Sequence, residues 1–352
     1  MATKLRGALI GCGMVSQFHL KGWQRIPEVE IVALADQDLN RAEGRRREFV
    51  PTARIYTDPA TLLSSERLDF VDILAPPAFH KEHCLLAKAA RLHVICQKPL
   101  SDDLNDARAL VAAMGDHPKL FVVHENHRYR PWFQRILSMH REGFFGRPRV
   151  VRLTQHDPNE PAEVYKLQAK HGVLLEYGTH LVDMMRALLG EPARVYAVTR
   201  RLNPRVQGES WALAIYDYAE TTVTIDIAWK PAGLPRGSVV IEGEKGAALY
   251  EGTMTRSASA RFRLTRGNEV AIDEWRSPHD DFVESFYLFQ RDCVDAMLSG
   301  RAITQTGVEN LKTLLLTFAA YTASDEGRVL NLENLSISPR FPSAPTGAKH
   351  QW

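Results

Sequence analysis

The chain has 352 residues, about twice the length of a usual single domain, so two domains are the first expectation. Hydrophobic residues make up 45% of it and charged residues 24%, which is the composition of a folded protein and excludes disorder of the whole chain. Lysines and arginines number 44 against 42 acidic residues, so the net charge of +2 lacks the basic excess typical of nucleic-acid binders. No segment approaches the roughly 18 apolar residues of a membrane span. We expect neither a nucleic-acid partner nor a membrane partner.

The cysteines and the first residues indicate the compartment. The four cysteines are widely spread and include no C-x-x-C pair, which argues against a disulfide framework or a zinc cage and is typical of a reducing cytoplasm. Residues 1–10 carry two basic residues and a short apolar run without a small-residue cleavage site, so we interpret them as mature structure and not as a signal peptide. We expect a cytoplasmic protein.

Over the first 125 residues, short apolar runs alternate with helix-like segments. Buried strands are predicted at 5–10, 30–35, 69–74, 93–96 and 120–123. Helices are predicted between them, for example over 79–90 and over 103–114. Such alternation is typical of βαβ units, in which helices cover both faces of a parallel sheet. We predict an α/β domain with a doubly wound parallel sheet over residues 1–125.

The pattern changes after about residue 149. Apolar and polar residues alternate over 222–229, which indicates a strand with one buried face, as is usual in antiparallel sheets. Similar runs are found at 195–199, 210–216, 238–242, 261–265 and 270–275. Two helices, over 280–298 and 307–324, follow them. We predict a second domain over residues 126–338 and a tail without periodicity over 339–352.

A glycine-rich turn lies between the first predicted strand and the helix after it. Gly11 permits a tight turn, and Gly13 lets the backbone approach a pyrophosphate, which the N-terminus of the following helix would also bind. Met14 and Val15 belong to the same turn and are expected to contact the cofactor. Ser16 replaces the third glycine of the usual fingerprint. The motif predicts a dinucleotide site, the alternative being a purely structural turn.

Asp36 ends the next predicted strand and bears on the choice of cofactor. A carboxylate at this place accepts hydrogen bonds from the adenosine ribose hydroxyls and repels a 2′-phosphate. Arg41 follows five positions later; it could turn onto a 2′-phosphate, or it could be a solvated charge on a helix face. We therefore expect NAD as the cofactor and treat NADP as the less favoured alternative.

Four more motifs stand in order along the chain. They are residues 96–99 (CQKP), 126–131 (NHRYRP), 172–183 (GVLLEYGTHLVD) and 319–328 (AAYTASDEGR). With the glycine turn, this set resembles the glucose–fructose oxidoreductase/inositol dehydrogenase (Gfo/Idh/MocA) family from about Lys4 to Leu330. The resemblance implies an N-terminal Rossmann domain and a C-terminal α/β domain with a large, mostly antiparallel open sheet. It also implies hydride exchange between NAD(P) and a sugar or cyclitol, in a homodimer or homotetramer that pairs the open sheets.

The resemblance points to Lys98 and His180 as the catalytic pair. Oxidation of a hydroxyl group needs an acceptor for its proton, for which a histidine is well suited, and a cation that stabilises the developing oxyanion. We expect His180 to be the general base and Lys98 to orient the hydroxyl and stabilise the oxyanion. Glu176 stands one turn before His180 if residues 174–189 form one helix, so it could bind substrate hydroxyls or tune the histidine.

The chain departs from the family pattern at two positions. Gln97 replaces the usual glutamate, which removes a carboxylate beside Lys98. Glu176 replaces the usual aspartate and keeps its charge on a longer arm, which affects substrate geometry more than the reaction. The resemblance also implies that a cis peptide bond precedes Pro99.

Other candidates lie around these motifs. Asn126, Arg128 and Asp183 are expected to bind substrate, although Arg128 could instead pair with a carboxylate and Asp183 could lie on a solvated helix face. Pro76 and His80 lie in a segment that resembles the nicotinamide side in the family.

We expect these two residues at the cofactor, together with Gln97, Lys98 and, for NADP, Arg41. The pairs His80-x-x-His83 and His124-x-x-His127 lack a third ligand at a recognisable spacing, so we expect no catalytic metal.

The sequence thus favours an NAD-dependent dehydrogenase that acts on a sugar, aldose or cyclitol. Residues 95–99 (ICQKP) look like the corresponding stretch of D-apiose dehydrogenases, which narrows the expectation to an aldopentose oxidised to a lactone. Two alternatives stay open. One is an enzyme that retains NAD and recycles the hydride during an epimerisation or elimination; the other is a nucleotide-binding sensor without catalysis.

Overall fold

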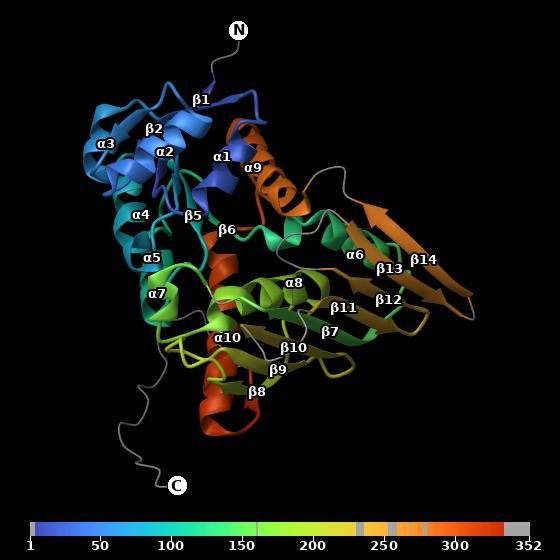
Figure 1. Cartoon of the computed structure of the whole chain (residues 1–352). Coiled ribbons are helices and arrows are strands. Elements are labelled where there is room, and N and C mark those ends of the chain that lie inside the picture. The colour runs from blue at the N-terminus through green and yellow to red at the C-terminus, as the bar shows by residue number, and fades with distance from the viewer. Residues whose placement is uncertain are drawn as a thin grey trace, which may run out of the picture.

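The computed structural model describes residues 4–159, 161–229, 236–252, 259–267, 269–276 and 280–333. The tail predicted over 339–352 lies outside these residues. The described chain is organised around two sheets, one of six strands and one of nine (Figure 1). None of its helices combines the length and the hydropathy that crossing a lipid bilayer requires.

The first sheet is fully parallel. Across the sheet, its strands are β3 (Arg54–Tyr56), β2 (Val29–Ala35), β1 (Leu5–Ile10), β4 (Phe70–Ile73), β5 (His93–Gln97) and β6 (Phe121–His124). The strand order reverses between β1 and β4, and ligands of such sheets bind beyond the carboxyl ends of the strands at this point. The predicted Rossmann fold is confirmed. The prediction missed β3, which has three residues and no apolar run.

Five helices connect these strands: α1 (Ser16–Trp23), α2 (Leu39–Phe49), α3 (Pro59–Ser65), α4 (His80–Ala89) and α5 (Leu104–Ala113). An aspartate side chain caps the start of three of them by accepting backbone N–H bonds: Asp38 at α2, Asp58 at α3 and Asp103 at α5. In contrast, α1 begins without a side-chain cap. Helix α4 also lacks a side-chain cap, but α1 is the uncapped helix that follows the strand β1, at the point where the strand order reverses, so its N-terminal amides are open to a ligand there.

The second sheet is mostly antiparallel, as expected. Its strands, in order, are β14 (Glu269–Arg276), β13 (Ser259–Arg266), β12 (Gly246–Glu251), β11 (Arg236–Gly243), β7 (Pro148–Asp157), β10 (Thr222–Trp229), β9 (Trp211–Asp217), β8 (Arg194–Arg200) and β15 (Leu330–Asn331). The pair of β7 and β10 is parallel. Buried and half-buried side chains alternate along β9, which confirms the period-two interpretation.

The remaining helices follow β6 in the chain. They are α6 (Pro131–Arg141), α7 (Val164–Leu167), α8 (Thr179–Leu189), α9 (Asp281–Ser299) and α10 (Gly307–Glu326). Helix α9 lies beside α1 although the two are far apart in sequence (Figure 1), and the rings of Phe18 and Phe282 meet there at 5.0 Å. Helix α10 packs on α5, α8 and β8.

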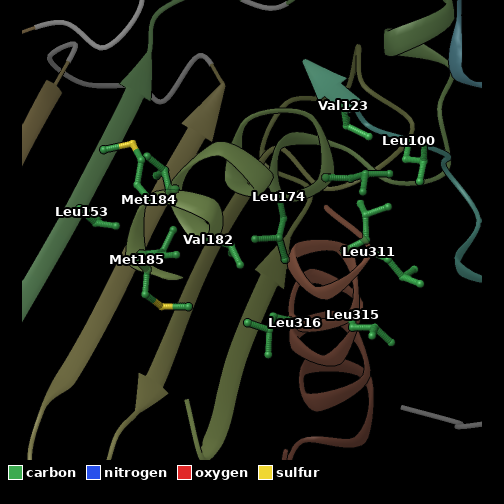
Figure 2. Close-up of a cluster of buried hydrophobic side chains, with 14 of the residues drawn as sticks. Leu100, Val123, Leu153, Leu174, Val182, Met184, Met185, Leu311, Leu315 and Leu316 are labelled. Carbon is green, nitrogen blue, oxygen red and sulfur yellow. The ribbon is translucent and has the colours of Figure 1, made fainter. Parts of the chain in front are cut away.

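One apolar core therefore spans both halves of the molecule. Figure 2 shows Leu100 and Val123, from the Rossmann half, gathered with Leu174 and Leu311 from the other half. All four side chains are fully buried or nearly so. Because this core continues across the junction, side chains from the two halves can be held at fixed positions in a shared site.

Candidate active site

A cavity of about 1050 Å³ lies between the two halves. One end is lined by the glycine turn after β1 and by residues that follow β2; the other end is lined by Lys98, the α7 segment and residues 176–180. The volume is at the upper end of the roughly 300–1,000 Å³ range of ligand sites, which suits two ligands bound side by side. This cavity is the candidate active site.

The glycine turn has the backbone that a pyrophosphate site needs. Gly11 has a φ of +102°, and a Cβ there would lie 2.7 Å from the carbonyl carbon of Leu74. A Cβ on Gly13 would meet no atom within 4 Å, so the backbone is open to a ligand here. Met14 and Val15 line the same end of the cavity, directly before the uncapped start of α1. The turn therefore fits the phosphates of a dinucleotide.

Asp36 is fixed beside this turn by backbone amides. Its Oδ2 accepts a hydrogen bond from the Cys12 amide at 2.7 Å, and its Oδ1 accepts one from the Asp38 amide at 2.8 Å. Arg41 also lines the cavity, with its Nε 3.4 Å from Asp38 Oδ2. The carboxylate is thus held in place, whereas the neighbouring guanidinium is engaged with another acid.

Arg45 is a cavity residue that the sequence analysis missed. Its Nε donates to Ser16 Oγ at 2.9 Å, and its Nη2 donates to the Gly13 carbonyl at 3.2 Å. It stands one turn of α2 after Arg41, and this i,i+4 spacing is the signal that would have identified it. It adds a positive charge next to the glycine turn.

The loop after β4 contributes Pro76 to the cavity lining but not His80. The His80 ring is fully buried, with Nε2 2.8 Å from the Ala75 carbonyl oxygen and Nδ1 3.3 Å from that of Leu100. Burial lowers the pKa of His80 to about 4, so the ring is neutral. The expectation that His80 contacts the cofactor is therefore wrong. The His80 ring instead stabilises the loop after β4 through its contacts with backbone carbonyls.

Gln97, at the end of β5, connects Lys98 to a buried histidine. Its Oε1 accepts the Lys98 amide at 2.7 Å, and its Nε2 lies 3.0 Å from Nε2 of His19. Nδ1 of His19 lies in turn 2.8 Å from Oδ2 of Asp72, and both of these side chains are fully buried. Since the amide of Gln97 donates to His19, the imidazole proton belongs on the nitrogen that faces Asp72. Gln97 therefore links the Lys98 backbone to the buried pair of His19 and Asp72.

Lys98 reaches from β5 to the second half of the molecule. The Lys98–Pro99 peptide bond is cis, as the resemblance implied. The ammonium donates to the backbone carbonyl of Glu176 at 2.6 Å and to its Oε1 at 3.0 Å. Among the described residues, these contacts use two of the three N–H donors, which leaves one for a substrate oxygen.

A π-helical turn presents that carbonyl to Lys98. The sequence predicts one regular helix over 174–189, but Leu174–Gly178 form a π-helical turn and α8 begins at Thr179. In an α-helix, the carbonyl of Glu176 would accept the amide of His180. The π-helical turn interrupts this regular pattern, and the Glu176 carbonyl accepts the Lys98 ammonium. Turns of this kind are frequent at functional sites.

The side chain of Glu176 is shared between two lysines. Its Oε1 lies 3.0 Å from Lys98 Nζ and 2.8 Å from Lys166 Nζ. Lys166 belongs to α7 and lies 3.4 Å from Glu163 as well. Burial opposes the ionisation of Glu176, but the two ammonium groups outweigh it and hold the pKa of this carboxyl well below its usual range. The sequence analysis missed Lys166, because no motif surrounds it.

His180 meets a different carboxylate. Its Nδ1 forms a hydrogen bond with Oε1 of Glu125, and its ring stacks on that of His127 with centroids 3.7 Å apart. Burial lowers the pKa of His180, and Lys98 acts in the same direction, whereas Glu125 opposes both. The neutral ring that a general base requires is therefore favoured. Glu125 is a third residue that the sequence analysis missed; it directly precedes Asn126 in the chain.

Comparison with known proteins decides the family. Residues 5–125 match the oxidoreductase family with an NAD-binding Rossmann fold (GFO_IDH_MocA), and residues 133–249 match the GFO/IDH/MocA C-terminal domain. The chain belongs to the Gfo/Idh/MocA family. It is an NAD(P)-dependent oxidoreductase that acts on CH–OH groups.

Several Gfo/Idh/MocA relatives have named activities. A D-apiose dehydrogenase from Paraburkholderia graminis is 32% identical, over 98% of this chain and 94% of that protein. A myo-inositol 2-dehydrogenase from Thermotoga maritima is 26% identical, over 94% of this chain and 99% of that protein. The crystal structure of an oxidoreductase from Agrobacterium radiobacter, in complex with NAD+, L-tartaric acid and magnesium, has a TM-score of 0.85 and 28% identity, and covers 94% of this chain and 99% of that one.

Of the substrate-binding candidates of this Gfo/Idh/MocA chain, Asn126 reaches the cavity and the other two do not. Asn126 Nδ2 donates to Ser285 Oγ at 2.7 Å. Arg128 binds both carboxylate oxygens of Asp183, with its Nε 2.6 Å from Oδ2. Asp183 is 1% exposed. Arg128 therefore pairs with a carboxylate, the alternative left open above, and Asp183 is buried as its partner instead of facing solvent or substrate.

Three buried side chains converge next to the cavity in a way that the sequence spacing does not indicate. The possible metal-ligand atoms of Glu125, His127 and His180 lie within 4.8 Å of one another. His124 is not part of this group, since its ring packs against that of His19 with centroids 4.1 Å apart. Carboxylate and imidazole donors of this kind can hold a zinc ion. The hydrogen bond between Glu125 and His180 gives the same atoms a second possible role.

Proposed function

We propose that this chain is an NAD-dependent dehydrogenase that oxidises a hydroxyl group of a neutral sugar or cyclitol. The observation that carries the proposal is the convergence of the Lys98 ammonium and the His180 imidazole on one cavity, whose other end is the glycine turn. A protein that only senses a nucleotide needs neither group at the far end of its site. A dehydrogenase needs both, as a cation for the oxyanion and as a base for the proton.

The nucleotide end favours NAD. Both oxygens of Asp36 are fixed by backbone amides and retain lone pairs for ribose hydroxyls. A 2′-phosphate would meet this negative charge, while Arg41 is held by Asp38. Arg45 and the backbone at Gly13 would hold the pyrophosphate. When bound, the nicotinamide supplies the hydride acceptor.

The chain's own groups move the proton and stabilise the charge. In this proposal, the substrate hydroxyl lies between Lys98 Nζ and the ring of His180. Because Nδ1 of His180 is engaged by Glu125, Nε2 is the nitrogen that accepts the hydroxyl proton. The hydride leaves the same carbon with the electron pair of its C–H bond, and the C–O bond becomes a carbonyl. Lys98 stabilises the negative charge that develops on oxygen during this change.

The charges at the substrate end favour a neutral substrate. Among the described residues that line it, the charged side chains are Lys98 and Lys166 against Glu163 and Glu176. Each lysine forms an ion pair with a glutamate. The positive charge of its ammonium group is therefore already balanced and does not favour the carboxylate of a sugar acid. Hydroxyl groups can donate to the glutamates and accept from the lysines. With a D-apiose dehydrogenase among the relatives, we infer an aldopentose such as apiose, oxidised to its lactone, as the narrower candidate.

A dehydrogenase assay with NAD and NADP against aldoses, cyclitols and sugar acids tests the proposal. We expect NADH formation with at least one neutral polyol and more than tenfold preference for NAD, roughly 1.4 kcal/mol. A preference for NADP would contradict our interpretation of Asp36. Nicotinamide that survives purification without net NADH formation would support the recycling enzyme. Nucleotide binding without turnover on any polyol would support the sensor.

We also propose that the chain forms a homodimer or homotetramer through its nine-stranded sheet. The support is the half-buried side chains that alternate with buried ones along β9 and β10, which leave one face of the sheet less covered than the other. Light scattering coupled to gel filtration measures the assembly.

A further inference from the structure

The carboxylate that contacts His180 lies outside the motif that contains the histidine. Glu125 directly follows β6, and its backbone carbonyl accepts the side-chain amide of Gln305 at 2.9 Å. Its side chain is 1% exposed, and its Oε1 accepts hydrogen bonds from His180 Nδ1 and, at 3.3 Å, from the His127 amide. His180 lines the cavity, whereas Glu125 does not. The carboxylate therefore lies on the side of the imidazole away from the cavity, held by two hydrogen bonds to its Oε1 and by the Gln305 bond to its backbone carbonyl.

We propose that Glu125 is the positioning residue for His180, an inference that rests on the proposed function. It holds the ring proton on Nδ1 and leaves Nε2 bare toward the cavity. It also provides the counter-charge when Nε2 accepts the substrate proton. The family motif assigns an acid four positions before the histidine, but here that acid, Glu176, is engaged by Lys98 and Lys166.

The burial of Glu125 makes this role physically reasonable. Its second oxygen, Oε2, is buried and has no hydrogen-bond partner among the described residues. A buried carboxylate that faces neutral groups is costly, and so is a buried imidazolium without a counter-ion. When His180 becomes protonated, each charge offsets the cost of the other. The pair therefore favours the state that forms when the substrate hydroxyl loses its proton.

The other groups around His180 do not replace Glu125. Lys98 opposes a positive charge on the ring, and Glu176 acts on it more weakly than Glu125 does. Burial holds the pKa of His124 and of His127 well below the usual value, so both rings are neutral. Tyr177 lies 6.5 Å away between ring centroids and is kept in its neutral form by burial. On the next turn of α8, Asp183 is neutralised by Arg128.

A metal ion held by Glu125, His127 and His180 is the competing explanation for the same geometry. Nδ1 of His180 already forms a hydrogen bond with Glu125, and a metal between them would have to replace that bond. The structure therefore favours the hydrogen-bonded pair. Metal analysis of the purified protein separates the two explanations.

The test compares Glu125→Gln with Glu125→Asp and with Glu209→Gln as the matched control. Glu209 is a half-buried glutamate that accepts hydrogen bonds from Tyr321 and from backbone amides instead of from a histidine. The ring ¹⁵N signals of His180, assigned with His180→Gln, report its pKa in the free protein without any substrate. We expect Glu125→Gln to lower this pKa by about one unit or more. Glu125→Asp should lower it less, and Glu209→Gln should leave it unchanged.

Kinetics provide the second readout. With Glu125→Gln, we expect kcat at neutral pH to fall at least about tenfold, the acidic limb of the pH profile to move to lower pH, and the KM for the nucleotide to stay unchanged. If Glu125 only stabilised the fold, Glu125→Gln would not shift the acidic limb of the pH profile. An unchanged His180 pKa, or a stoichiometric metal that is lost in Glu125→Gln, would overturn the proposal.

The two proposals can fail separately. If the wild-type protein oxidises no polyol, the proposed function fails, yet the ¹⁵N titration still decides the role of Glu125. If Glu125→Gln does not fold, the Glu125→Asp titration decides it: a lowered His180 pKa supports the role, and an unchanged one refutes it.

Discussion

The two ends of the cavity are built in different ways. The nucleotide end is made by the segments that follow two consecutive strands, β1 and β2, in which the turn at Gly11 and the backbone amides that fix Asp36 provide most of the geometry. The substrate end is assembled from separate segments whose side chains are joined by ion pairs and hydrogen bonds: Lys98, Glu125, Lys166, Glu176 and His180. The comparison teaches that backbone changes should damage the first end, whereas side-chain changes should damage the second.

Lys98→Met has the largest expected effect and removes the cation from the substrate end. We expect kcat to fall by about 10²–10³-fold, the usual loss when a donor to a developing oxyanion is removed. Binding of NADH, measured by fluorescence titration, should stay within about twofold (~0.4 kcal/mol) of wild type.

Lys88→Met is the matched control, since Lys88 pairs with Asp116 on the surface of the Rossmann half. If Lys98→Met weakened NADH binding as much as it slowed turnover, the two ends would not be independent.

Gly11→Ala is the corresponding change at the nucleotide end. A Cβ at a φ of +102°, 2.7 Å from the Leu74 carbonyl carbon, strains the turn. We expect NADH binding to weaken by about 5- to 150-fold, equivalent to roughly 1–3 kcal/mol of strain. Calorimetry and thermal denaturation check binding and folding in parallel.

The control is Gly44→Ala in α2, where a Cβ meets nothing within 4 Å. It should raise stability by about 0.5–1 kcal/mol, because alanine replaces a glycine inside a helix. Equal NADH affinity in the two variants would show that the turn does not control binding.

Lys166→Met has the smallest expected effect and sharpens the comparison within the substrate end. Removal of one ammonium lets the pKa of Glu176 rise toward its usual value, while Lys98 keeps the carboxylate ionised at neutral pH. We expect the KM for the substrate to rise about threefold, on the order of 0.5–1 kcal/mol, with little change in kcat.

The pH dependence of stability gives an independent check. Because its folded pKa is depressed, Glu176 stabilises the fold above its unfolded pKa, about 4.3, and this contribution is lost as the pH falls toward the folded value. Lys166→Met should therefore reduce the resistance to acid unfolding, whereas Lys81→Met, which removes an exposed pair with Asp106 outside the cavity, should not. Identical acid unfolding of both variants would contradict this account.

The sequence predicted the nucleotide end well because its determinants are local. Gly11, Gly13 and Asp36 lie at the ends of two consecutive strands, so their positions in the fold follow from the strand–helix alternation alone. The two errors in predicting this half of the molecule also have local causes. β3 is too short to leave an apolar pattern, and His80 starts a helix beside the cavity but turns its ring into the protein.

The substrate end was predicted in part, through motifs. Lys98 and His180 were identified because each lies in a family motif, and the structure brings both to the cavity. Glu125 and Lys166 have no such context, since their roles depend on contacts between residues far apart in the chain. Helical spacing suggested that Glu176 serves His180, but the π-helical turn between them directs it to the lysines instead.

That turn also constrains how the protein can change its specificity. Deletion of one residue between 174 and 178 would convert it to a regular helix with i→i+4 bonds, in which the Glu176 carbonyl would bond a helix amide and no longer anchor the Lys98 ammonium. Amino-acid substitutions within residues 174–178 keep the number of residues in the turn unchanged. New substrate preferences can therefore arise by point mutation. Insertions and deletions in this segment are expected to disrupt the site instead. Variant libraries that aim to broaden the range of accepted sugars should therefore keep the length of residues 174–178 unchanged.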